Sequence, residues 1–232
     1  MRSSFNAYGR AANEYGSLHI PIWLGTVRPV PVGGTLDQNY NVDGLLLPAG
    51  SPIAISGNVI KPFVGFEVVS FTAGDGTTVT TDSIVVKPAV FGAAEFAPEV
   101  DDVIQKVGAT FDAKGKAAVV TASDLLTSGD NKGCYEVKVA HSATIDTPSA
   151  GDVIVLSAAT SAGSNKSIAV QPNAYLLHDI WLGNLDASAS DTFATGAAVQ
   201  YHPEGILIDR TPAASVKAAM KAAVPGVLQV NE

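Results

Sequence analysis

The feature that most constrains the fold is a proline-bounded corner between two apolar segments, in the stretch DGLLLPAGSPIAIS at residues 43–56. Three leucines at 45–47 lead into Pro48, and an alternating apolar segment starts at Pro52. Each proline removes a backbone hydrogen-bond donor that the middle of a sheet requires. We therefore expect an edge strand or a strand–turn–strand corner, turning at Ala49–Gly50, with no catalytic chemistry in it.

Charge and composition limit the classes of partner. The 232 residues include 14 Lys+Arg and 22 Asp+Glu, which gives a net charge of −8. The basic residues form no cluster, which argues against nucleic acid as a partner. No hydrophobic run has the length of a membrane span, and the N-terminus lacks the apolar region of a signal peptide. The lone Cys134 cannot form an internal disulfide.

The distribution of breakers and apolar runs divides the chain into three parts. Residues 1–42 carry many Gly and Pro and little periodicity, and we expect an extended N-terminal arm. Residues 43–95 together with 146–232 are predicted to form a β-rich body with a C-terminal helix. Residues 96–145 are predicted to form a small α+β insertion. The expected fold class is therefore mainly β, with a β-sandwich or barrel-like body.

Strands are predicted wherever short apolar or alternating runs lie between turn residues. The expected strands are 53–55, 59–71 with a bend at Pro62 and Gly65, 79–86, 117–121, 134–140, a β-pattern at 148–156, and 205–208, with a last strand or arm at 227–230. Gly57-Asn58 and Gly74-Asp75-Gly76 are expected to be turns.

Two helices are predicted from apolar spacing and end signals. In the first, at 99–107, Val100, Val103, Ile104 and Val107 follow the i, i+3, i+4, i+7 pattern. The second begins after Thr211 as the N-cap, with Pro212 at its first position. Its apolar side is expected to comprise Ala213, Val216, Met220 and Ala223.

Two short sequences recur. Pro48–Ile53 resembles Ser149–Ile154, and both tryptophans lie in the same tetrapeptide, IWLG, at 22–25 and 180–183. The two tetrapeptides are expected either to pack their indoles together or to pair as strands. We predict that Ile22, Trp23, Leu24 and Trp181 are interface anchors, because Trp and its apolar neighbours often dominate protein interfaces.

The titratable residues form no recognisable catalytic or metal-binding pattern. His19, His141, His178 and His202 lack a metal-ligand spacing, so no metal is expected. Cys134, His141 and Asp146 stand in an order that a thiol enzyme could use, although a buried inert thiol is the commoner case. No cofactor motif is found, and we expect a protein that is not an enzyme. The aromatic residues Phe63, Phe66, Phe71, Tyr175 and Tyr201 favour core or interface positions over a sugar-binding face.

The corner at Leu45–Ile55, the strand at Gly205–Ile208 and the N-terminal arm together resemble tailed-bacteriophage head-decoration proteins, also called auxiliary capsid proteins. In that family a strand enters through a similar LPAG turn, and a late GIL strand closes a small β-domain. The resemblance covers about residues 43–72 and 196–212. The segment 96–145 is foreign to the smallest members, which places their trimeric contact in doubt here.

The resemblance implies a structural virion protein, made in the host cytoplasm, that binds the outer surface of a phage capsid and cements it. It implies the major capsid protein as partner, together with other copies of the chain or a head fibre protein. The acidic charge fits the outer face, since a protein facing packaged DNA would need positive charge.

Two other classes remain open. One is a virion fibre base or a receptor- or glycan-binding module, with its site in the segment 96–145 or in the strand 175–181. The other is a small hydrolase, which would need a cluster of titratable side chains.

Overall fold

The computed structural model describes residues 23–24, 35–37, 46–47, 50–87, 96–141, 145–176, 180–181, 205–209 and 214–231. The body is mainly β, as predicted, and its centre is a closed six-stranded barrel. Going around the barrel, the strands are β6 (Gly65–Thr72), β7 (Thr81–Val86), β10 (Tyr135–Ala140), β9 (Gly115–Leu125), β8 (Val103–Lys106) and β11 (Val153–Leu156). The antiparallel pairing of β11 with β6 closes the ring, with Val153 opposite Glu67. An additional strand, β12 (Gly163–Lys166), pairs with β9.

Alternating side chains fill the barrel. In β7 the buried positions are Asp82, Ile84 and Val86, which alternate with half-buried residues. In β10, Val137 and Val139 are buried while Glu136 and Lys138 are only half-buried. These apolar residues share one cluster with Phe66, Val68, Ile104, Val120 and Ile154. The period-two pattern therefore directs one face of each strand into the barrel.

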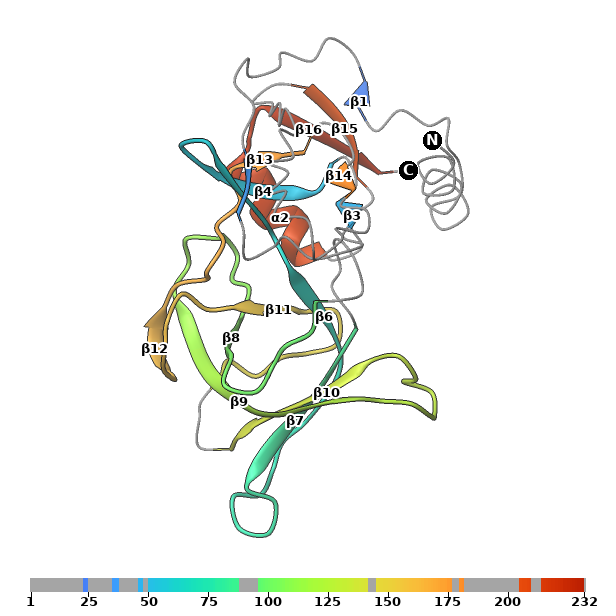
Figure 1. The fold of residues 1–232 in the computed structure, drawn as a ribbon, viewed down its shortest axis with the longest axis vertical. Helices are drawn as coiled ribbons and strands as arrows, with labels where there is room; N and C mark the ends of the chain where they lie inside the picture. The colour runs from blue at the N-terminus through green and yellow to red at the C-terminus, as the bar shows by residue number, and fades with distance from the viewer. Residues whose placement is uncertain are drawn as a thin grey trace, which may run out of the picture.

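Short strands surround one end of the barrel (Figure 1). A four-stranded sheet has the order β13 (Ala174–Tyr175), β4 (Pro52–Ser56), β5 (Val59–Pro62), β2 (Thr35–Leu36). A three-stranded sheet has the order β1 (Trp23–Leu24), β15 (Gly205–Asp209), β16 (Val227–Asn231), and β3 (Leu46–Leu47) pairs with β14 (Ile180–Trp181). In the described part of residues 1–42, where an extended arm is expected, β1 and β2 are thus short strands that are added to sheets of the body.

Helix α2 (Ala214–Ala223) packs against the outside of the barrel. Its buried residues Val216, Ala219 and Met220 belong to a second apolar cluster with Phe63, Tyr175 and two residues of β11, Val153 and Val155. Because Ile154 points into the barrel and its neighbours point to the helix, β11 is buried on both faces. The predicted C-terminal helix is confirmed, except that Ala223 is exposed, and Thr211, Pro212 and Ala213 lie outside the described residues.

The predicted bend at Pro62 and Gly65 is confirmed, since β5 ends at Pro62 and β6 begins at Gly65. A Cβ atom on Gly65 would lie 2.7 Å from Val153 and 3.0 Å from the Phe63 ring. Phe63 in turn packs on Phe111, with ring centroids 5.3 Å apart. Glycine is therefore required at this position, because the junction between the two apolar clusters leaves no space for a side chain.

Strand β11 begins at a corner with a characteristic hydrogen-bond pattern. Gly151 has a positive φ of 86°. Its N–H donates to the Val68 carbonyl at 2.9 Å, and the Val68 N–H donates to the Asp152 carbonyl at 2.8 Å. The Asp152 carboxylate accepts a hydrogen bond from the Ser149 N–H at 2.7 Å. We call this arrangement the capped corner.

The same capped corner precedes β8. Asp101 has a positive φ of 74°, donates its N–H to the Val120 carbonyl at 2.9 Å, and is followed by Asp102, whose carbonyl accepts from the Val120 N–H at 2.8 Å. The Asp102 carboxylate accepts from the Glu99 N–H at 2.7 Å. Aspartate tolerates the left-handed region better than most residues, which explains how it replaces glycine here.

The corner before β4 shares the main-chain part of this pattern. Gly50 has a φ of 82° and donates to the Leu176 carbonyl at 2.6 Å, and the Leu176 N–H donates to the Ser51 carbonyl at 2.9 Å. Among the described residues, β4, β8 and β11 thus begin with the same turn. The predicted strand–turn–strand corner is confirmed. The edge-strand alternative is wrong, because β4 lies between β13 and β5 and Pro52 is its first residue.

The helix predicted at 99–107 is wrong. Val103 and Ile104 lie in β8, which pairs with both β9 and β11. Because β8 is covered on both faces, its adjacent residues Val103 and Ile104 are both buried. Val100 lies in the preceding turn and is 55% exposed, so its helical spacing from these residues is a coincidence. The α+β insertion expected at 96–145 instead supplies β8, β9 and β10, three strands of the barrel.

Candidate functional site

The predicted interface anchors lie in two different sheets. Trp23 and Leu24 form β1, where Trp23 is opposite Leu207 in β15. Trp181 is in β14, opposite Leu46 in β3. The two IWLG segments therefore do not pair with each other, which overturns that alternative. Ile22 lies outside the described residues.

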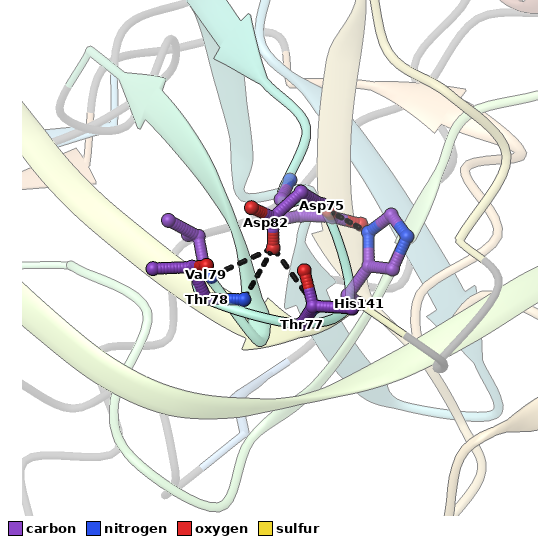
Figure 2. A network of polar contacts seen from close by, with 7 residues as sticks. Asp75, Thr77, Thr78, Val79, Asp82 and His141 are labelled. Carbon is purple, nitrogen blue, oxygen red and sulfur yellow. Dashed lines mark hydrogen bonds and ion pairs between the residues drawn. The ribbon is translucent and has the colours of Figure 1, made fainter.

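The most elaborate polar arrangement in the described chain is the hairpin tip, residues 73–80, which joins β6 to β7. Figure 1 shows this tip at the end of the barrel opposite β1, β15 and β16. The Asp75 carboxylate oxygen Oδ1 accepts three backbone hydrogen bonds, from Thr77, Thr78 and Val79, at 2.7–2.8 Å (Figure 2). These bonds lower the pKa of Asp75 from 3.8 to about 2, because each of them favours the ionised carboxylate.

A second carboxylate holds the tip to the barrel. Asp82 lies on the barrel-facing side of β7, and its Oδ1 atom accepts from the Gly74 N–H at 2.8 Å. The same oxygen lies 2.6 Å from Nδ1 of His141, the residue that follows β10. The backbone N–H of His141 donates to the Thr80 carbonyl. A Cβ on Gly76 would lie 3.1 Å from the His141 ring. The tip is therefore fixed in shape by its own carboxylate and fixed in position by the Asp82–His141 pair.

The carboxylates of this tip serve the turn itself. The ionised Asp75 carboxylate is occupied by three donors and is a poor base at neutral pH. Cys134, His141 and Asp146 do not come together as the catalytic group of a thiol enzyme. His141 is hydrogen-bonded to Asp82, and Asp146 accepts a hydrogen bond from the Lys116 N–H. Cys134 and His141 flank opposite ends of β10, which separates them by roughly 20 Å at the usual strand rise.

The sequence predicts a turn at the tip but not the side-chain hydrogen bonds that hold it in place. The signal for Asp75 is the pattern Asp-Gly-Thr-Thr, in which an aspartate can bond the following backbone N–H groups. The signal for Asp82 is a carboxylate in register with Ile84 and Val86 in an alternating strand. Of the other histidines, His19, His178 and His202 lie outside the described residues.

Within the described ranges, no group of three or more His, Cys, Asp or Glu side chains is arranged to hold a metal ion. No helix in the same ranges is long and apolar enough to cross a membrane. The predicted core role of Phe63, Phe66 and Tyr175 is confirmed, as each is at most 2% exposed.

No family model, curated protein or solved structure matches the chain.

Proposed function

We propose that the chain is a structural virion protein that binds the outer surface of a phage capsid and stabilises it. On this proposal it is not an enzyme. Its partner is the major capsid protein, and its neighbours are other copies of the chain or a head fibre protein. The chain would be made in the host cytoplasm and reside on the virion.

The observation that carries the proposal is the way short strands attach to the body. Strand β2 adds to β5 in parallel, and β1 adds to the outer side of β15. Main-chain pairing at sheet edges is a general mode by which an extended segment of one protein binds another. A cement protein that crosses subunit boundaries could use the same mode.

Two further features bear on the proposal, and the first of them favours an outer-surface position. The net charge of −8 disfavours contact with packaged DNA. The corner and the late strand that carry the family resemblance fold as β3–β4 and β15. Both lie toward the end of the molecule away from the hairpin tip (Figure 1).

The test is co-sedimentation of the purified chain with empty shells of the phage whose genome encodes it. We expect saturable binding and a higher temperature of shell disruption. A chain that stays in the supernatant at every shell concentration would overturn the proposal.

A matched pair of variants locates the contact. Trp23→Ala is expected to weaken shell binding, because Trp is among the residue types enriched at interface hot spots. Val79→Ala changes a half-exposed residue of the hairpin tip, at the opposite end, and is expected to leave binding unchanged. Both variants should retain the circular dichroism spectrum of the parent.

The hairpin tip favours a second candidate, a fibre-base or receptor- or glycan-binding module. A protruding loop held rigid before binding loses little conformational entropy when a ligand arrives. A glycan array would discriminate the two functions. Binding that is lost in Asp75→Ala and retained in Trp23→Ala would favour the second candidate.

A further inference from the structure

Strand β9 is paired differently along its two halves. Its first half lies between β8 and β12, with Ala117 opposite both Gln105 and Gly163. The last main-chain bonds on the β8 side are those of Val120 with the second capped corner. Beyond them, residues 122–125 pair with β10 alone among the described strands, and Thr121 lies at the bulge where the β9–β10 register shifts. This segment is an open sheet edge on the hairpin that extends sideways from the barrel (Figure 1).

Exposed apolar side chains mark the two ends of this open edge. Val100, 55% exposed, immediately precedes the corner residue Asp101 that bonds Val120. Leu125, 52% exposed, ends β9 opposite Tyr135. An open edge with apolar side chains at both ends is suited to the addition of another strand.

The charge of the edge is unbalanced. Asp124 is exposed and directly opposite Glu136, so two carboxylates share one face of the hairpin. Glu136 has an ion pair with Lys138 at 3.6 Å and a hydrogen bond from Ser83. Asp124 has no hydrogen bond or ion pair within the described residues. Like charges directly opposite each other destabilise a hairpin, so a cation beside Asp124 would stabilise it.

We infer that the open edge Thr121–Leu125 binds an extended protein segment that carries a basic residue opposite Asp124. The inference rests on the proposed function for the source of that segment, which would be an exposed basic strand of the capsid protein. Main-chain pairing would supply the affinity, and Asp124 would select the charge of the incoming strand.

The test uses a short synthetic peptide of alternating lysine and valine, followed by backbone amide shifts of the ¹⁵N-labelled chain. We expect concentration-dependent shifts confined to residues 100 and 121–125 and their β10 partners. The peptide with glutamate in place of lysine should bind at least about tenfold more weakly, as expected for like charges in contact. Shifts elsewhere, or equal binding of the two peptides, would overturn the inference.

Two variants, each with one aspartate replaced by lysine, test whether the position of the charge matters. Asp124→Lys should weaken the lysine peptide and strengthen the glutamate peptide. Asp130→Lys, in the exposed loop of the same hairpin, should leave the preference unchanged. Loss of the preference in both variants would mean that only overall charge matters, which would also overturn the inference.

Shell binding separates this inference from the proposed function. If Asp124→Lys binds shells as well as the parent does, the edge is not the contact and the proposed function stands. If the parent binds no shells and the lysine peptide still shifts residues 121–125, the edge stands and the capsid assignment falls.

Discussion

The capped corners before β8 and β11 have the same hydrogen-bond geometry and different sequences. The residue at positive φ is Asp101 in one corner and Gly151 in the other. The capping carboxylates also differ, because Asp152 forms an ion pair with Lys106 at 3.1 Å as well as its bond to the turn. The hydrogen-bond pattern, and not one residue type, therefore defines the corner.

The two corners also differ in the sequence distance of their partners. The corner before β8 bonds Val120, in the next strand along the chain. The corner before β11 bonds Val68, in a strand formed much earlier, and so it closes the barrel. If the corners are equivalent as local structures, changes within them should have similar effects in spite of this difference.

The largest expected effects come from the isoleucine that follows each corner. Ile104 and Ile154 are each 1% exposed and lie in the barrel core. Ile104→Ala and Ile154→Ala should each cost about 2–5 kcal/mol of unfolding free energy through lost burial and a cavity. Urea unfolding followed by circular dichroism measures both. Val100→Ala, at an exposed turn position, is the control and should change stability by less than about 0.5 kcal/mol.

Removal of the capping carboxylates gives the next largest effect. Asp102→Ala should cost about 1–2 kcal/mol, since it leaves the Glu99 N–H without its charged acceptor. Asp152→Ala should cost more, by up to about 1 kcal/mol, because the Lys106 ion pair is lost as well. Lys106→Met removes only the ion pair and should account for the difference. Equal losses for the two aspartates would show that the ion pair contributes nothing.

Exchanging the positive-φ residues should give changes of opposite sign. Gly151→Ala is expected to cost about 1–2 kcal/mol because of the backbone strain alone, as a Cβ there meets no atom within 4 Å. Asp101→Gly is expected to raise stability by several tenths of a kcal/mol by removing the same strain, less the flexibility that glycine adds to the unfolded chain. Thermal unfolding of both variants against the parent checks the signs. Destabilisation by Asp101→Gly would mean that the Asp101 side chain itself supports the corner.

The smallest effect on global stability is expected at the hairpin tip, where a carboxylate also closes a turn. Since the pKa of Asp75 is about 2 when folded and 3.8 when unpaired, its contribution is complete above pH 3.8 and is lost as the pH falls toward 2. The protection of amides 77–79, relative to unstructured amides at the same pH, should therefore fall over that range, while the barrel amides remain protected. Asp75→Asn should remove the pH dependence. Simultaneous loss of barrel protection would show that the tip is not an independent turn.

The sequence predicted the fold class, the C-terminal helix and most strands, because period-two alternation and proline or glycine breaks are local signals. It failed at 99–107, because burial of β8 on both faces is a property of the barrel and not of the segment. The similar sequences around Gly50 and Gly151 indicate that the corner recurs. They give no sign of the third corner at Asp101, where aspartate occupies a position typical of glycine.

The candidate site was less predictable. The turn at Asp75 follows from neighbouring residues, whereas the Asp82–His141 contact joins residues 59 positions apart. The open edge of β9 depends on which strands lie beside it, and that is decided by closure of the barrel.

Closure of the barrel also sets an order of events in folding. Since β6 pairs with β11, with Glu67 opposite Val153, a chain emerging from the ribosome can form the β6–β7 hairpin early but cannot close the ring until β11 has been synthesised. The pairing is antiparallel and distant in sequence, so closing that loop costs chain entropy before the core compensates for it. Ring closure is therefore the step expected to limit the rate of folding, and α2, which covers the outer face of β11, docks after it.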